Sequence, residues 1–288
     1  MVVWDDIKST YDTIGKLSKI DAQNNEITTL FLRLHLQCRE LLYSTSTIEL
    51  LSKIPDKNYF AFYKNKMSRA VNRDLFIDHE SIQRIILCIV NDDLDGTSSE
   101  EITKALYTMA VSFCCVVDLS KTGDQKTPGT FFEYFASHWF AIMLKVQPIT
   151  KIDVLNLDMR TSLTTDYIFD LGVGRPKIHM PVKTSTRERV IQVWAHQRVL
   201  DGIYGTGRFL GMLSCLSETK TDTKKREVVE ICLPDQWRVY QMFIAQMYRI
   251  YYLDIPLKYK ELNSIFPPIV VKPYGEMFYE IKNLFTHY

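Results

Sequence analysis

The chain has 288 residues, of which 46% are hydrophobic and 24% are charged, with only 11 glycines and 10 prolines. These values exclude disordered and fibrous proteins, and they allow a sizeable hydrophobic core. The 35 Lys and Arg residues nearly balance the 34 Asp and Glu residues, so the chain as a whole lacks the strong positive charge of many nucleic-acid-binding proteins.

Membrane insertion and secretion are not expected. The uncharged stretch between Lys104 and Asp118 is shorter than the roughly 20 apolar residues that cross a bilayer. The first residues, Met1 to Asp6, lack the basic flank and apolar segment of a secretory signal. The six cysteines lack the short paired spacings of zinc sites. We expect a cytoplasmic protein whose cysteines are reduced.

The first 120 residues are predicted to be helical. Apolar residues recur there at spacings of three and four, as at Leu30, Leu34 and Cys38. Ser98 and Glu101 have the spacing of a capping box at the start of one helix. Further helices are expected at 48–54, 59–72, 79–91 and 98–117.

A polar, turn-rich stretch at 121–129 marks the predicted boundary between a helical N-terminal region, residues 1–120, and a second domain, residues 121–288. The second domain is predicted to mix helices and strands in the order αββαββα, which gives an α/β (α+β) fold. Its predicted helices are 130–146, 186–203 and 235–251, and its predicted strands are 166–173, 178–184, 209–216 and 227–233.

The first two of these strands form a predicted hairpin around a tight turn at 174–177, and they carry Asp170 and Lys183. Metal-dependent cleavage of a phosphodiester requires a carboxylate that holds the cation and an ammonium group that orients water or offsets charge in the transition state. Asp170 and Lys183 could supply both groups. Taken alone the pair is weak evidence, because any hairpin may carry one acid and one lysine.

The segment from Lys183 to Gln197 resembles the motif of type II restriction endonucleases of the PD-(D/E)XK superfamily. It is most similar to the subgroup that contains EcoRII, PspGI, NgoMIV and Cfr10I and reads CC and GG steps. The resemblance covers about thirty residues closely and the element order from about 129 to 250 loosely. It implies a restriction-endonuclease-like core, with a central mixed β-sheet flanked by helices. It does not extend to the first 120 residues, where apolar spacing predicts a helical N-terminal sub-domain.

The resemblance also implies the catalytic residues. Asp170 falls on the metal-binding aspartate of the family and Lys183 falls on its lysine. Glu133 resembles the additional acid on the preceding helix, so Asp170 and Glu133 would hold Mg²⁺. The alternative for Glu133 is an acid in the first turn of a helix, where the helix dipole favours it.

The chain departs from the family pattern at two places. Pro181 stands where the general motif has an acid, and the helix positions that carry the acid in the subgroup hold His196 and Gln197. Gln192 lies one helical turn before His196, on the same face. Either His196 or Gln192 replaces the missing acid, or Glu133 takes over its role.

Arg187, Glu188 and Arg189 fall on the base-reading triplet of the subgroup. Arginine can donate two hydrogen bonds to guanine, and a carboxylate can accept one from cytosine. The triplet lies in a basic segment, residues 175–226, with eleven Lys or Arg against four Asp or Glu. Two alternatives are a solvated run of charges and a capping box formed by Ser185 and Glu188.

Together these features predict a Mg²⁺-dependent type II restriction endonuclease that cleaves double-stranded DNA at a palindromic site containing CC…GG. We expect a homodimer, or a tetramer, in a bacterial or archaeal cytoplasm, without membrane contact. One alternative is a catalytically impaired DNA-binding protein on a nuclease framework. A second alternative is an interaction scaffold without DNA affinity.

Overall fold

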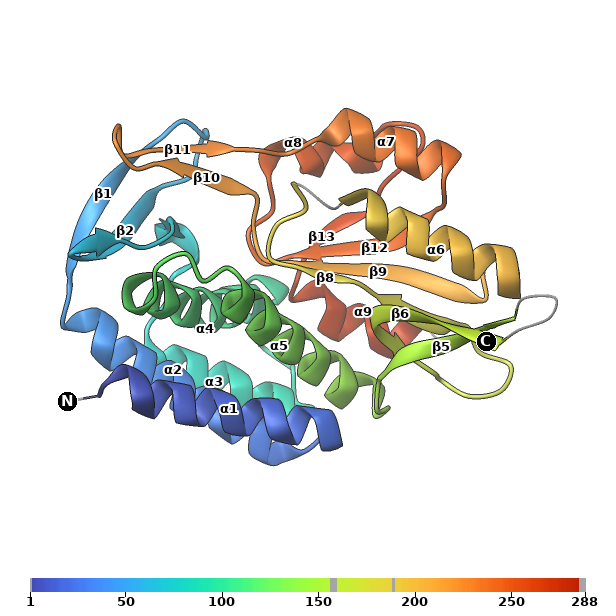
Figure 1. The fold of residues 1–288 in the computed structure, drawn as a ribbon, viewed down its shortest axis with the longest axis horizontal. Coiled ribbons are helices and arrows are strands. Elements are labelled where there is room, and N and C mark those ends of the chain that lie inside the picture. The colour runs from blue at the N-terminus through green and yellow to red at the C-terminus, as the bar shows by residue number, and fades with distance from the viewer. Residues whose placement is uncertain (1, 156–159, 188–189, 285–288) are drawn as a thin grey trace.

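A computed structural model describes residues 2–155, 160–187 and 190–284 (Figure 1). The helices are α1 (Trp4–Ile20), α2 (Asn25–Tyr43), α3 (His79–Val90), α4 (Ser99–Ser120), α5 (Lys126–Leu144), α6 (Val190–Tyr204), α7 (Pro234–Phe243), α8 (Leu257–Lys260) and α9 (Glu276–Leu284), with the short 3-10 helices η1 (Arg73–Leu75) and η2 (Glu261–Ser264). The strands are β1 (Ser46–Ser52), β2 (Tyr59–Lys64), β3 (Lys66–Met67), β4 (Val71–Asn72), β5 (Ile149–Leu155), β6 (Arg160–Phe169), β7 (Lys177–Met180), β8 (Val182–Lys183), β9 (Phe209–Cys215), β10 (Thr219–Asp222), β11 (Glu227–Glu230), β12 (Met247–Tyr252) and β13 (Val271–Pro273).

A mixed sheet forms the centre of the C-terminal half. Its strand order is β13-β12-β9-β7-β6-β5, and β8 also pairs with β9. The pairs β13–β12, β12–β9, β9–β7 and β9–β8 are parallel, whereas β6 is antiparallel to both β7 and β5. This central mixed sheet with flanking helices confirms the predicted α/β fold class.

Helices cover both faces of this sheet (Figure 1). On one face, Trp194 of α6 packs 5.3 Å from Trp237 of α7, in a buried cluster with Tyr252 of β12. On the other face, Phe140 of α5 packs 6.2 Å from Tyr251 of β12. Successive side chains of a strand point to opposite faces, so the neighbours Tyr251 and Tyr252 each anchor one helical layer.

The first 120 residues are not entirely helical. The helices expected at 48–54 and 59–72 are wrong, because β1 to β4 occupy this part of the chain. They belong to a second sheet of order β10-β11-β1-β2-β3, in which β1 runs parallel to β11 and β4 pairs with β2. The partner strand β11 lies far along the sequence, so local periodicity carries no sign of this pairing.

The helices predicted at 79–91 and 98–117 are confirmed as α3 and α4, and Ser98 and Glu101 form the expected capping box. By length and composition α4 could cross a membrane, but 83% of its apolar window is buried inside the protein. One hydrophobic cluster joins buried residues from Ile7 to Ile281 and includes most of α4, so we describe α4 as a core helix. The boundary near residue 120 stays a prediction.

The long helix expected at 235–251 is also wrong. It ends as α7 at Phe243, and residues 247–252 form β12, which is buried between β9 and β13. Tyr and Ile favour strands, and an apolar run that is buried on both faces fits a helical period as well as an extended one. The apolar residues of the predicted helix therefore divide between α7 and β12.

Candidate active site

Lys183 forms an ion pair with an aspartate, and this aspartate is Asp166. The Nζ atom of Lys183, in β8, donates to Oδ2 of Asp166, in β6, at 2.7 Å. The same oxygen accepts from the backbone N–H of Val182 at 2.8 Å. The two charged side chains are 24% and 25% exposed, so the pair is partly shielded from water and still accessible from one side.

The structure does not bring Asp170 to Lys183. Asp170 follows the last residue of β6, is 47% exposed, and accepts from Lys177 at 2.6 Å. This hydrogen bond lowers the pKa of Asp170. Phe169 pairs with Ile178, so Asp170 lies at the turn end of the hairpin and Lys183 lies beyond its other end. At about 3.3 Å per residue the two positions are roughly 20 Å apart along the strand.

The length of the hairpin loop explains this correction. A tight turn at 174–177 would pair residue 170 with residue 181. In the structure the loop takes up residues 170–176, and Gly172 and Gly174 both have positive φ there, 97° and 81°. Tyr167 pairs with Met180. If this register is continued by one residue, residue 166 lies opposite residue 181. Two closely spaced glycines were the signal in the sequence for a wider loop.

A polar cavity of about 330 Å³ contains the ion pair. It is also lined by Glu133 from α5 and by Gln192 and His196 from α6. Four of the residues predicted for the catalytic site, Glu133, Lys183, Gln192 and His196, thus converge on one cavity together with Asp166. Gln192 and His196 are both present because residues four apart share a helix face.

The charges in this cavity favour a cation. Burial raises the pKa of Glu133, the negative charge of Asp166 raises it further, and Lys183 opposes the rise. Lys183 neutralises part of the charge of Asp166 and leaves Glu133 as a second acid. A cation in this cavity would relieve the repulsion between the two carboxylates and favour the ionised form of Glu133.

The two α6 side chains at the cavity differ from their neighbour Gln197. Burial lowers the pKa of His196, which keeps its imidazole neutral near pH 7, and Gln192 is exposed. Gln197 is 1% exposed and bonded to His179, Asp201 and the carbonyl of Phe209, so it belongs to the core.

The donor atoms in the cavity suit Mg²⁺. Among the described residues no three His, Cys, Asp or Glu side chains cluster as a complete metal site. Mg²⁺ does not require one, because it is typically held by one or two carboxylates, several waters and substrate phosphates. Within the described chain the hydrogen bonds to the Asp166 carboxylate reach Oδ2, which leaves Oδ1 able to bind a cation. Glu133 and the amide oxygen of Gln192 would offer further oxygen donors.

The predicted base-reading triplet is only partly visible. Arg187 is exposed, and its backbone N–H donates to Oγ of Ser185 at 3.4 Å. Glu188 and Arg189 lie outside the described residues. The hydroxyl of Ser185 also donates to Glu218 at 2.9 Å, and the alternative capping box with Glu188 falls outside the described residues.

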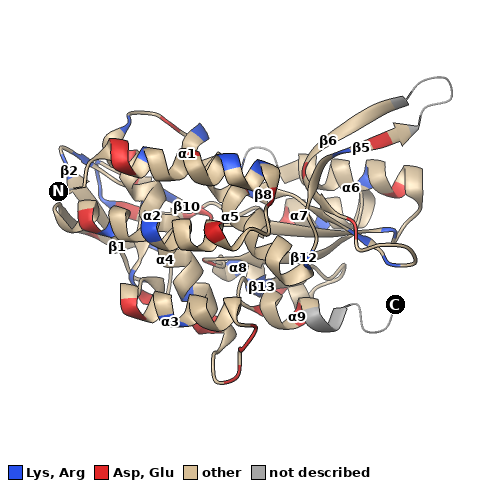
Figure 2. Cartoon of the chain, turned by 90° about the horizontal axis from the view of Figure 1, so that it is seen from below, with Lys and Arg blue, Asp and Glu red and all other residues tan. Residues whose placement is uncertain are grey.

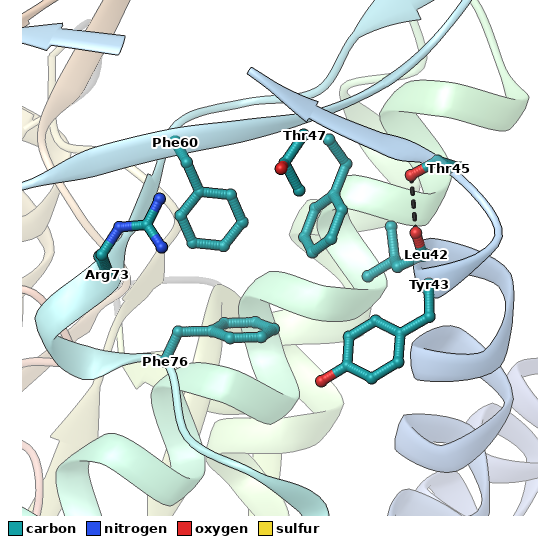
Figure 3. A pocket seen from close by; sticks show the side chains of 8 residues that line it. Leu42, Tyr43, Thr45, Thr47, Phe60, Arg73 and Phe76 are labelled. Atoms are coloured by element: carbon teal, nitrogen blue, oxygen red, sulfur yellow. Dashed lines mark hydrogen bonds between the residues drawn. The ribbon is translucent and has the colours of Figure 1, made fainter. Parts of the chain in front are cut away.

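A second cavity, of about 420 Å³, lies between α2, β1, β2 and the segment after η1 (Figure 3). Aromatic side chains surround it, among them Tyr43, Phe60 and Phe76. Its cation is Arg73, whose guanidinium lies over the Phe60 ring and pairs with Glu49. Among the described residues no carboxylate lines it, so it lacks the acid pair of the first cavity.

Comparison with known structures finds restriction endonucleases. The crystal structure of the type IIP restriction endonuclease Kpn2I matches with a TM-score of 0.82 and 28% sequence identity, over 98% of each chain. A complex of the restriction endonuclease PspGI with substrate DNA matches with a TM-score of 0.44 and 13% identity, over 73% of this chain and 91% of that chain. No protein-family model and no curated protein sequence matches the chain. The predicted fold and enzyme class are confirmed, because this chain has throughout its length the fold of a type IIP restriction endonuclease, an enzyme of the site-specific deoxyribonuclease class.

Proposed function

We propose that this protein is a Mg²⁺-dependent endonuclease that cleaves double-stranded DNA at a palindromic sequence containing CC…GG. The observation that carries the proposal is the Asp166–Lys183 ion pair in a polar cavity beside Glu133. An acid pair next to a lysine is the combination that metal-assisted cleavage of a phosphodiester requires. The likeness to a restriction endonuclease over the whole chain supports the same chemistry.

In the proposed mechanism Asp166 takes the metal-binding role that the sequence suggested for Asp170. Asp166 and Glu133 would hold the cation, with Gln192 as a further oxygen ligand. A bound Mg²⁺ lowers the pKa of a water ligand and offsets negative charge on the phosphate. Lys183, held in place by Asp166, would orient the attacking water and stabilise charge that develops on the phosphate oxygens.

His196 is the second polar group that α6 adds to the cavity. Its imidazole is neutral near pH 7 because burial lowers its pKa, so it can accept a proton from the attacking water or contribute a nitrogen ligand. The in-line attack would leave a 5′-phosphate and a 3′-hydroxyl.

We further propose that Arg187, Glu188 and Arg189 read the bases in the major groove. Arginine forks suit guanine O6 and N7, and a carboxylate suits cytosine N4, so a short triplet can read adjacent G and C edges. Arg187 is only four positions after Lys183 in the sequence, which would keep the scissile phosphate close to the bases that are read. A palindromic target would be matched by a homodimer, with a tetramer as the alternative.

The opposite side of the molecule is poorly suited to DNA. Figure 2 marks acidic residues in red on α3 and on the loop that follows it, and this loop contains Asp92, Asp93 and Asp95. Repulsion from phosphate would disfavour DNA there. This distribution agrees with DNA binding on the side of the active-site cavity. We also propose a location in a bacterial or archaeal cytoplasm, where such an enzyme meets foreign DNA.

The alternative function is a DNA-binding protein that has lost cleavage. It is favoured by one observation: the α6 side chains in the cavity are His196 and Gln192 rather than an acid. Digestion of a phage genome with the purified protein and Mg²⁺, followed by sequencing of the ends, separates the two functions. Discrete ends within CC…GG sequences support the nuclease, and specific binding without new ends supports the alternative.

A further inference from the structure

Glu218 is a buried acid outside the catalytic cavity, and its hydrogen bonds converge on the segment that joins Lys183 to Arg187. It follows β9, directly before β10, and is 1% exposed. Its Oε2 accepts from the hydroxyl of Ser185 at 2.9 Å. Its Oε1 accepts from the backbone N–H of Thr186 at 2.6 Å and from the Thr186 hydroxyl.

A fourth donor reaches Glu218 from the protein core. The hydroxyl of Tyr252, in β12, donates to Oε1 at 2.9 Å. Burial raises the pKa of Glu218, and the hydrogen bonds from Thr186, Ser185 and Tyr252 oppose this rise. A buried carboxyl is costly unless its oxygens are hydrogen-bonded, and charge-assisted bonds of this kind are strong. Three of its four donor groups belong to two consecutive residues, so Glu218 holds that short segment against the sheet.

The bonds of Glu218 continue a backbone attachment that begins at Lys183. The N–H of Leu216 donates to the carbonyl of Lys183 at 3.2 Å, and the N–H of Ser217 donates to the carbonyl of Thr184 at 3.3 Å. Glu218 then fixes the next two residues through its side chain. Arg187 is the first residue beyond this attachment and is exposed.

We propose that Glu218 is a positioning residue that fixes the path of the chain between the catalytic lysine and the base-reading residues. This inference rests on the proposed function and deepens it. The carboxyl sets the point at which residue 187 leaves the protein surface, and therefore where its guanidinium meets the edge of a base. Discrimination between target and near-target sequences then depends on a residue that touches no DNA.

The test compares Glu218→Ala with the wild type on two duplexes, one with the target found by end sequencing and one with a single changed G·C pair. Cleavage in Mg²⁺ gives kcat/KM for each duplex. Glu218→Ala loses the charge-assisted hydrogen bonds from Ser185 and Thr186. The kcat/KM for the target duplex divided by that for the changed duplex should therefore fall by about tenfold or more. Binding to a random duplex should stay at the wild-type level, because phosphate contacts supply it.

Two variants separate positioning from general stability. Glu218→Gln keeps an acceptor for Thr186 and should restore much of the discrimination. Tyr252→Phe removes the donor on the core side and leaves the bonds to Ser185 and Thr186, so it should discriminate like the wild type. Equal damage in Tyr252→Phe and Glu218→Ala would overturn the inference.

The remaining outcomes are also distinct. If Glu218→Ala does not fold, the double change of Ser185→Ala and Thr186→Val removes the side-chain donors from the other partner and should lower the ratio in the same way. If the wild type cleaves and the variants discriminate normally, only the role of Glu218 is rejected and the proposed function stands. A wild type that cleaves no DNA rejects the proposed function itself.

Discussion

The carboxyl of Asp166 and the ammonium of Lys183 lie 2.7 Å apart, although the two residues are seventeen positions apart in the sequence. Asp166 also accepts from the backbone N–H of Val182, so the acid fixes both the side chain and the strand of the lysine. Glu133 reaches the same cavity from α5, on a different layer of the fold. The cavity thus gathers its charged groups from a helix and two strands of one sheet.

Replacement of His196 by Glu tests whether α6 contributes to cation binding. His196 lines the cavity, and a carboxylate there restores the acid that related enzymes carry on this helix. We expect Mg²⁺ to support cleavage at lower concentrations in His196→Glu, because a third carboxylate strengthens an oxygen-ligand site. The measurement is cleavage rate against Mg²⁺ concentration.

Ile191→Glu is the matched control, because Ile191 lies on the same helix, is 48% exposed and is not among the residues that line the cavity. It should leave the Mg²⁺ dependence unchanged. An unchanged dependence in His196→Glu would place residue 196 away from the cation.

Arg187→Ala should relax the choice of target. A lost pair of hydrogen bonds to guanine costs about 1–3 kcal/mol of discrimination at that base. Target preference is measured by sequencing the cut ends from a randomised library. Arg198→Ala is the control, because Arg198 is an exposed arginine on α6 outside the predicted triplet. It should keep the wild-type preference. The same preference in both variants would remove Arg187 from base reading.

Much of this site could be predicted from the sequence, since Lys183, Glu133, Gln192 and His196 follow from a motif and from helical spacing. The partner of Lys183 could not be, because it depends on the register of a hairpin whose loop takes seven residues rather than four. The strand β1 was also missed, because its partners include β11, more than 170 residues away. Local patterns predict elements, whereas register and distant pairing depend on the whole fold.

Buried histidines should make the protein sensitive to mild acid. Burial lowers the pKa of His138 to about 4 and the pKa of His179 to about 4, from an ordinary value of 6.5. Between pH 6.5 and pH 4 the unfolded chain therefore binds more protons than the native protein. The free energy of unfolding is thus highest above pH 6.5 and falls as the pH decreases through this range. At pH 5 each histidine should cost about 2 kcal/mol of unfolding free energy.

Urea unfolding at pH 7 and pH 5 measures this loss. His138→Gln keeps a donor for the carbonyl of Ala22 and an acceptor for Thr28, but it does not titrate. It should lose less stability between the two pH values than the wild type does. An identical loss in the variant would mean that His138 does not contribute to acid sensitivity.

The homodimer can be tested at an apolar surface beside α7. Phe243 and Phe266 are each 76% exposed, and Met242 is 47% exposed. The guanidinium of Arg238, in α7, donates a hydrogen bond to the backbone carbonyl of Phe266 and so links α7 to the loop that carries Phe266. Exposed apolar patches often mark association surfaces. We expect sedimentation to show a dimer for the wild type and a weakened dimer for Phe243→Asp. Leu87→Asp, on α3, should sediment like the wild type, and an unaffected dimer in Phe243→Asp would place the interface elsewhere.

The central claim, that Asp166 rather than Asp170 works with Lys183, is tested most directly by the cleavage rates of Asp166→Asn and Asp170→Asn with Mg²⁺ and target DNA. Lys183→Ala serves as the inactive reference. We expect Asp166→Asn to lose activity by roughly 10³-fold while it still binds target DNA, because it removes a charge that holds both the cation and the lysine. Asp170→Asn should cleave at close to the wild-type rate. An inactive Asp170→Asn beside an active Asp166→Asn would contradict the claim.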